Sequence, residues 1–198
     1  MVRPAQTARS ERTREALRRA ALVRFLAQGF EDTSAEQIAA DAGVSLRTFY
    51  RHFTSKHDLL FADFDAGLHW FRSALAAHSA DESIIESVQS AIFAFPYDVE
   101  AVTKIAALRA HELDPVRIVR HIRAVEADFA DAVAEHLARR HQPATPDERL
   151  RVTVTSRCIA GAVFGAMEVW MLGEDRSLAE LSRLSHAALT ALQRGGIA

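Results

Sequence analysis

The sequence has a single cysteine, Cys158, and few of the residues that interrupt helices. Eight glycines and five prolines are spread over 198 residues. One cysteine cannot form a disulfide within its own chain, which is consistent with a reducing compartment. Runs of β-branched residues are also scarce, whereas alanine, leucine, arginine and glutamate are frequent. This composition predicts an all-α fold.

Long hydrophobic runs are missing too. No stretch approaches the roughly 20 consecutive apolar residues that span a bilayer, and the sequence shows no signal-peptide pattern. Hydrophobic residues nevertheless make up 49% of the chain, which is ample for a buried core. We therefore expect a cytoplasmic protein without a membrane partner, built as one large or two small domains.

Patterns typical of catalysis and metal binding are not found. The sequence shows no Gly-rich phosphate loop, no nucleophile elbow and no pair of carboxylates at a catalytic spacing. Nine histidines are present, His111 and His121 among them, but no Cys or His pair has convincing ligand spacing. Solvated or helix-capping histidines are the better interpretation. We expect no enzymatic activity, no metal site and no cofactor.

Charge is unevenly divided, although the net charge is only −2. Residues 1–56 hold ten Lys or Arg against six Asp or Glu, a net of +4, and the remainder has a net of −6. Only the first part would be attracted to a phosphate backbone. A solvated basic helix face is the alternative interpretation of that excess.

Residues 34–56 have the features of a helix-turn-helix, with the sequence SAEQIAADAGVSLRTFYRHFTSK. Ser34, with Gln37 three positions later, predicts a capping box at the start of the first helix. Gly43 can adopt the positive φ that the tight corner requires. Ser45 then predicts the N-cap of the second helix. Such a pair places its second helix in a DNA major groove.

The second helix of the pair leaves polar residues exposed beside its apolar stripe. A bidentate arginine–guanine contact discriminates by roughly 1–3 kcal/mol, so Arg47 is our candidate base reader. Tyr50, Arg51 and Lys56 are better placed on the DNA backbone, which positions the protein without reading sequence. An ordinary amphipathic pair with a solvated charged face is the alternative. The candidate DNA-binding residues are Thr33, Ser34, Ser45, Arg47, Thr48, Tyr50, Arg51, His52 and Lys56.

The same region resembles the N-terminal domain of the TetR family of bacterial transcriptional regulators. The resemblance rests on Gly29-Phe30, Thr33-Ser34, Ile38-Ala39, the Ala-Gly-Val-Ser of residues 42–45 and the Thr-Phe-Tyr-x-His-Phe of residues 48–53. It implies that Tyr50 and Lys56 grip phosphates and that Thr48 lies at the DNA surface. The family often has a small residue where Arg47 stands, so no operator sequence can be carried over.

The resemblance also implies an architecture of nine helices in two parts. We expect residues 1–54 to form a helix-turn-helix DNA-binding domain, with residues 1–9 as a flexible arm. Residues 55–198 would form a helical effector-binding and dimerisation domain. Apolar periodicity and caps predict helices near residues 10–28, 35–42, 46–53, 55–78, 81–95, 98–113, 115–140, 149–172 and 177–193.

A dimer is predicted from the last two helices. Between Ile159 and Trp170 the chain is nearly apolar all round, which indicates a helix covered on more than one side. A second subunit is the simplest cover, as in the four-helix assembly that the resemblance implies, and a core helix of a monomer is the alternative. A twofold dimer predicts a palindromic operator. The candidate interface residues are Gly161, Gly165, Trp170, Leu181 and Leu184.

Aromatic side chains are frequent on the helices that should face one another. Most would simply pack, but the resemblance implies that some line a cavity for a small, largely apolar effector. The candidate pocket residues are Phe64, Trp70, Phe71, Gln89, Phe93, Arg109, His111, Phe129 and Phe164. We expect a dimeric repressor that such an effector releases from double-stranded DNA in the bacterial nucleoid. The alternative is a helical sensor or protein-interaction module that does not act through DNA.

Overall fold

The computed structural model describes residues 4–79, 82–94 and 99–195, and within these ranges it is helical without a strand. The all-α prediction is therefore confirmed. The described part of the chain contains nine α-helices and one 3-10 helix, in this order: α1 (Pro4–Gln28), α2 (Ala35–Asp41), α3 (Leu46–His52), η1 (Lys56–Phe61), α4 (Ala62–Ala77), α5 (Ile84–Phe93), α6 (Val99–Glu112), α7 (Pro115–His141), α8 (Pro146–Leu172) and α9 (Leu178–Gln193).

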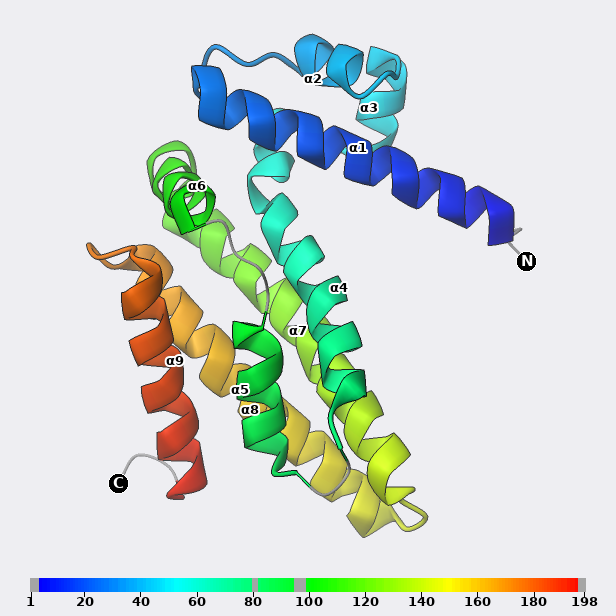
Figure 1. The fold of residues 1–198 in the computed structure, drawn as a ribbon, viewed down its shortest axis with the longest axis vertical. Coiled ribbons are helices and arrows are strands. Elements are labelled where there is room, and N and C mark those ends of the chain that lie inside the picture. The colour runs from blue at the N-terminus through cyan, green and yellow to red at the C-terminus, as the bar shows by residue number, and fades with distance from the viewer. Residues whose placement is uncertain (1–3, 80–81, 95–98, 196–198) are drawn as a thin grey trace.

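The helices form two groups, which Figure 1 shows as a short unit at one end and a longer body below it. In the short unit α1 packs on α2, and α2 packs on α3. In the body the two longest helices, α7 and α8, pack against each other, and α9 covers α8 while α4 packs on α7. The 3-10 helix η1 joins the groups, since it contacts both α1 and α6.

Local capping explains most of the boundaries. Ser45, Asp114 and Ser177 each accept a backbone N–H at the start of α3, α7 and α9, as N-cap residues do. The predicted start of α8 at residue 149 is wrong. Thr145 and Glu148 form a capping box three residues earlier, and the proline at position 146 takes the first helical position, which needs no N–H donor.

The first helix is longer than its apolar pattern predicts. It begins at Pro4 rather than near Ser10, so the arm predicted for residues 1–9 is helical from Pro4 onward. Proline is favoured in the first turn of a helix, where its missing N–H costs nothing. Residues 1–3 lie outside the described ranges.

The segment that links the two groups is a 3-10 helix followed by an α-helix, not one continuous α-helix. One helix was expected from residue 55 to residue 78, but its first six residues, Lys56–Phe61, form the 3-10 helix η1. Three of them, Leu59, Leu60 and Phe61, are buried. They belong to one hydrophobic core that runs from Leu17 in α1 to Leu189 in α9. The packing is therefore continuous across the domain boundary predicted at residues 54 and 55.

Among the described helices, α8 is long and apolar enough to cross a membrane by length and composition. This is weak evidence, because a core helix of a globular protein passes the same test. Only 33% of its most apolar segment is buried within the chain. The absence of a membrane partner stays a prediction.

Candidate nucleic-acid interface and ligand cavity

The helix-turn-helix has the predicted local geometry. Ser34 and Gln37 complete the capping box, because the Ser34 side chain accepts from the Gln37 backbone and the Gln37 side chain accepts from the Ser34 backbone. Gly43 takes a φ of 68° at the corner. Arg24 of α1 donates to both carboxylate oxygens of Asp41 at 2.5 and 2.9 Å, and this hydrogen bond lowers the pKa of Asp41. The capping box therefore fixes the start of α2, and the Arg24–Asp41 pair fixes its end next to the corner.

The face of α3 that points away from the core is polar. Arg47, Tyr50 and Arg51 are exposed, whereas Phe49 of the same helix is fully buried and anchors it. The Ser45 hydroxyl accepts the Thr48 N–H at 3.2 Å and lies 3.0 Å from the Thr48 hydroxyl, so both belong to the cap of the helix. Three long side chains capable of meeting DNA therefore project from a short, well-anchored helix.

Thr33 does not belong to this face. It is 1% exposed, and its hydroxyl donates to the Gly29 carbonyl at 2.7 Å. The side chain of Thr33 therefore does not lie on the exposed face of the helix-turn-helix, and its contact with DNA stays a prediction. Ser34 is half-buried as the N-cap of α2.

Lys56 is used inside the protein. Its Nζ donates to three carbonyl oxygens of the turn between α1 and α2, those of Phe30 (2.8 Å), Glu31 (3.3 Å) and Thr33 (3.1 Å). The ammonium also lies 4.2 Å from the centroid of the Phe30 ring. Because an ammonium has three N–H donors, this arrangement occupies all of them. Lys56 thus connects η1 to the α1–α2 turn, and its phosphate contact stays a prediction.

His52 was expected at the exposed end of α3, but the structure places it half-buried. Its Nε2 is buried and has no hydrogen-bond partner among the described residues. Burial lowers the pKa of His52, and the positive charges of Arg51 and Arg14 lower it further. A neutral imidazole is a weaker partner for a phosphate than a charged one, and the contact of His52 with DNA stays a prediction.

One ion pair across the two groups was not predicted. Asp58 of η1 and Arg117 of α7 meet at 2.8 Å, while the other oxygen of Asp58 accepts the N–H groups of Thr54 and Ser55. Burial alone would raise the pKa of Asp58, but the Thr54 hydroxyl, these N–H groups and Arg117 bring that pKa below its ordinary value. Arg117 lies 59 positions from Asp58 in the chain, so local sequence patterns could not indicate this pair.

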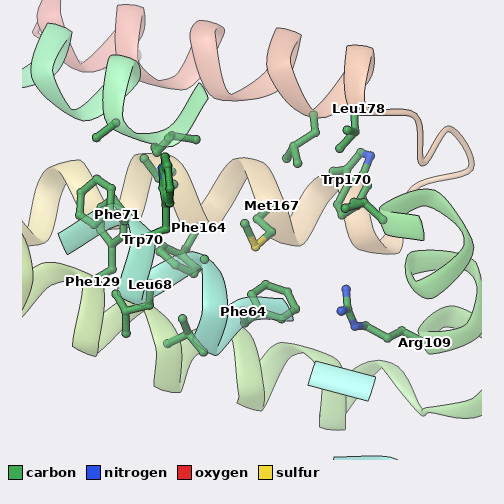
Figure 2. A pocket seen from close by; sticks show the side chains of 17 residues that line it. Phe64, Leu68, Trp70, Phe71, Arg109, Phe129, Phe164, Met167, Trp170 and Leu178 are labelled. Atoms are coloured by element: carbon green, nitrogen blue, oxygen red, sulfur yellow. The ribbon is translucent and has the colours of Figure 1, made fainter. Parts of the chain in front are cut away.

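The body encloses an apolar cavity of about 120 Å³ between α4, α5, α6, α7, α8 and α9. Figure 2 shows aromatic side chains from α4, α7 and α8 around it, with Arg109 entering from α6. Phe71 and Phe129 stack with their ring centroids 4.0 Å apart, and Phe164 meets Phe129 edge to face. The predicted pocket residues that line the cavity are Phe64, Trp70, Phe71, Arg109, Phe129 and Phe164.

Three predicted pocket residues are elsewhere. Gln89 lies 3.5 Å from the ring of His186 of α9, Phe93 is 47% exposed, and His111 is exposed with its Nδ1 2.9 Å from Glu112. Helical periodicity placed them on the right elements but could not tell which side of each element faces the cavity.

Two residues predicted at a dimer interface instead line this cavity. Trp170 is 3% exposed, and its indole N–H donates to the Ser177 carbonyl at 2.9 Å. Leu181 also lines the cavity, and Leu184 packs on the core. Gly161 and Gly165 are exposed on α8, where a Cβ at residue 165 would meet nothing within 4 Å. Gly161 and Gly165 are the exposed members of the predicted set, Leu181 and Leu184 are half-buried, and the interface stays a prediction.

The described residues contain no group of three His, Cys, Asp or Glu side chains that could hold a metal ion. Cys158 is exposed on α8.

Comparisons with known proteins agree with this geometry. Residues 17–62 match the family model of the bacterial regulatory proteins of the tetR family, and residues 99–195 match the family model of the MftR C-terminal domain. The HTH-type transcriptional regulator TcmR of Streptomyces glaucescens is 31% identical over 191 residues, covering 92% of this chain and 83% of TcmR.

Solved structures share the fold. FadR of Thermus thermophilus, a TetR-family repressor solved with lauroyl-CoA, superposes with a TM-score of 0.63 at 23% identity and covers 93% of this chain and 95% of its own. SmeT, the repressor of a Stenotrophomonas maltophilia multidrug efflux pump, has a TM-score of 0.52 at 21% identity, with 91% and 89% covered. The chain therefore belongs to the TetR family of bacterial regulatory proteins, and is a transcriptional regulator with an N-terminal helix-turn-helix and a C-terminal ligand-binding domain.

Proposed function

We propose that this regulator is a dimeric repressor that reads a palindromic operator through α3 and leaves it when a small, largely apolar effector binds. The observation that carries the proposal is the exposed face of α3. Arg47, Tyr50 and Arg51 project from a helix whose start is capped by Ser45 and whose position is set by the buried Phe49. Rigid presentation of long polar side chains is what groove reading needs.

Arg47 is the base reader in this proposal. It lies in the first turn of α3, the part of a recognition helix that contacts base edges, and it is exposed. Its guanidinium forms a planar fork that matches the two acceptors of guanine. Tyr50 and Arg51 lie farther along the helix and would contact the backbone of the duplex, which positions the protein without reading bases.

The dimer is supported by an unpartnered apolar face on α8. Its exposed members recur every three or four positions and so lie on one side of the helix. Two glycines in the middle of the face permit close approach of a second backbone. Large apolar patches on a surface usually mark an interaction site. The exposed residues are Leu150, Val154, Cys158, Gly161, Gly165, Val169 and Leu172.

The proposal that an effector releases the protein from DNA is supported by the size and lining of the cavity. Its 120 Å³ is smaller than the roughly 300–1,000 Å³ of ordinary ligand pockets, so a ligand would favour a conformation with a wider cavity. A ligand shifts such an equilibrium by its difference in affinity for the two conformations. The cavity is bounded by α4, α6 and α7, and η1 connects α4 to the DNA-binding helices. Widening would thus change the spacing of the two recognition helices.

The test is a fluorescence anisotropy titration of the full-length protein on a labelled DNA fragment from upstream of its own gene, with random competitor DNA. We expect specific binding that Arg47→Ala weakens by about tenfold or more, since one bidentate pair is worth ~1–3 kcal/mol. The matched control is Arg123→Ala, which removes an exposed arginine from α7.

Two outcomes would contradict the proposal. One is equal affinity for promoter fragments and random competitor, which would favour a sensor that does not act through DNA. The other is an equal effect of the two substitutions, which would show that net charge, rather than the face of α3, determines binding.

A further inference from the structure

We infer that the ion pair between Asp58 of η1 and Arg117 of α7 fixes the orientation of the DNA-binding helices relative to the body, which makes both residues positioning residues for operator binding. The inference rests on the proposed operator binding and specifies how the recognition helix is held in place. Arg117 Nη2 donates to Asp58 Oδ1 at 2.8 Å. Because a carboxylate repels phosphates, the part of Asp58 in DNA binding is indirect.

The carboxylate of Asp58 joins two parts of the chain through its two oxygens. Oδ2 accepts the N–H groups of Thr54 at 2.9 Å and of Ser55 at 3.1 Å, and the Thr54 hydroxyl donates to it at 2.6 Å. Thr54 and Ser55 directly follow Phe53, the C-cap of α3. Oδ1 accepts from Arg117 of α7. One side chain thus contacts the end of the recognition helix and the body at the same time.

Both ends of this contact are anchored. Arg117 lies in the first turn of α7, where the N-cap residue Asp114 accepts the Arg117 N–H at 2.9 Å. The next residue, Ile118, is 2% exposed and belongs to the core. On the other side, Asp58 is followed by Leu59, which is 3% exposed. Close-packed segments move as units, so a contact between two such segments restricts how one is oriented on the other.

Stability does not explain the position of this pair. The N-terminal end of a helix is positive and disfavours a cation, yet Arg117 lies in the first turn of α7. The side chains of Arg117 and Asp58 are 37% and 32% exposed, and ion pairs that water reaches contribute little to the free energy of unfolding. The pair should therefore affect orientation more than stability.

A palindromic operator makes orientation count in both subunits. The two recognition helices must enter the grooves at a fixed spacing. A DNA-binding unit that samples other orientations is competent for only part of the time, and the apparent dissociation constant rises by the inverse of that fraction. Because the pair is present in each copy of the chain, its loss should act at both half-sites.

Substitutions at the two positions test the inference in anisotropy titrations of the full-length protein on the fragment from upstream of its own gene. Asp58→Asn keeps an oxygen that can accept from Thr54 and Ser55 but removes the charge that attracts Arg117. Arg117→Met removes the donor. We expect each variant to raise the dissociation constant about tenfold. Arg117→Lys can still donate to Asp58 Oδ1 and should stay within about threefold of the wild type.

Three further measurements separate positioning from DNA contact and from stability. The double variant Asp58→Asn/Arg117→Met should bind no more weakly than either single variant, since one substitution already breaks the pair. The salt dependence of binding should keep its slope, which loss of a phosphate contact would lower by about one unit. The midpoint of urea unfolding should change little. Arg123→Met, which removes an exposed arginine of α7, should behave as the wild type in all three.

Orientation can also be measured without DNA. Nitroxide labels at Ala27→Cys in α1 and Ala127→Cys in α7, both exposed positions, report the distance between the two groups of helices by double electron–electron resonance. The single cysteine is replaced as Cys158→Ser, and excess unlabelled protein of the same variant limits the signal to pairs within one chain. We expect a narrow distance distribution with the intact pair and a broader one in Arg117→Met.

The outcomes separate this inference from the proposed function. Wild-type operator affinity in both single variants, additive effects in the double variant, a lower salt slope in Arg117→Met, or an unchanged distance distribution would each overturn the inference. If one variant does not fold, the other decides, and loss of folding in both would show a purely structural role and overturn it as well. A wild type without any operator preference overturns the proposed function, whereas the distance distributions still decide whether the pair fixes the orientation.

Discussion

The two groups of helices expose their functional features in opposite ways. In the first group the helix-turn-helix pair α2 and α3 is short and closely capped, and the candidate functional side chains remain outside, such as Arg47 and Tyr50. In the second group the long helices α7 and α8 form the body, and the functional features are what packing leaves open: a cavity of about 120 Å³ inside and an uncovered apolar face outside. Substitutions in the first group should therefore remove contacts of single side chains. Substitutions in the second group should change the cavity or the surface on which another subunit packs.

The uncovered face of α8 gives the largest expected effect. Val169→Arg places a charge on this face and should raise the dissociation constant of the dimer by ~100-fold or more, because an unpaired buried charge costs several kcal/mol. Sedimentation velocity measures the change. Val116→Arg on α7 is the matched control, since Val116 is 66% exposed and Val169 is 60% exposed. A Val169→Arg variant that sediments as the wild-type dimer would remove α8 from the interface.

The substitution Lys56→Met tests whether Lys56 contacts the protein itself or DNA. Lys56→Met should lower the free energy of unfolding by about 2 kcal/mol, since it removes the donor from three carbonyls and hydrogen bonds to charged groups are worth ~1.5–3 kcal/mol. Urea unfolding followed by circular dichroism measures the change. Arg51→Met on the exposed face of α3 should leave unfolding unchanged.

The opposite result is the one that the family resemblance implies. If Lys56 gripped a phosphate, Lys56→Met would leave unfolding unchanged and flatten the salt dependence of DNA binding by about one unit. Observing that pattern would show that the contacts of Lys56 rearrange on the operator.

Substitutions of glycine by alanine should have a smaller effect on the free energy of unfolding, and its sign should depend on the φ angle of the glycine. Gly43 has a φ of 68°, so Gly43→Ala should destabilise by about 1 kcal/mol even though its Cβ would meet no atom within 4 Å. Gly67→Ala in α4 is the matched control. Its Cβ also meets nothing within 4 Å, and without a positive φ it should stabilise by up to ~1 kcal/mol through helix propensity. Equal effects in thermal unfolding would contradict the role of the corner.

The smallest expected effect is a loss of stability in mild acid. Burial lowers the pKa of His57 and of His136, and nearby arginines lower both further. The unfolded chain then binds protons more readily than the folded one. Stability should be complete above about pH 6.5, the ordinary value for histidine, and should decline as the pH falls toward 5.

Urea unfolding at several pH values measures this slope. His136→Leu should make it shallower, because it removes one of the buried groups, whereas His69→Leu on the exposed side of α4 serves as the control. An unchanged slope in His136→Leu would mean that His136 is protonated as easily in the folded state as in the unfolded chain.

The local features of the fold were predictable because they depend on neighbours in the chain. The capping box of Ser34 and Gln37, the positive φ of Gly43 and the cap at Ser45 are all as the sequence predicts. Each involves residues within four positions of one another, so no knowledge of tertiary packing is needed. The boundary errors at α1 and α8 are local too, since each helix begins at a proline several residues before its first periodic apolar residue.

The direction of a side chain at the junction of elements was not predictable. Lys56 and Thr33 lie in a segment that resembles the family closely, yet both turn inward onto the α1–α2 turn. Trp170 belongs to an apolar helix with two candidate partners, and only the position of α9 decides that its indole packs inside the chain. Such choices depend on contacts between residues far apart in the sequence.

Composition, periodicity and capping act over a few residues, and they were enough to predict the helical class, the helix-turn-helix and the family resemblance. Only the tertiary structure decided which aromatic residues enclose the cavity, which α8 residues remain on the outer face, and that Arg109 reaches the carbonyl of Leu60, 49 positions earlier in the chain. The physical reason is that burial and charge placement are set by how helices pack. That packing minimises exposed apolar surface over the whole chain at once.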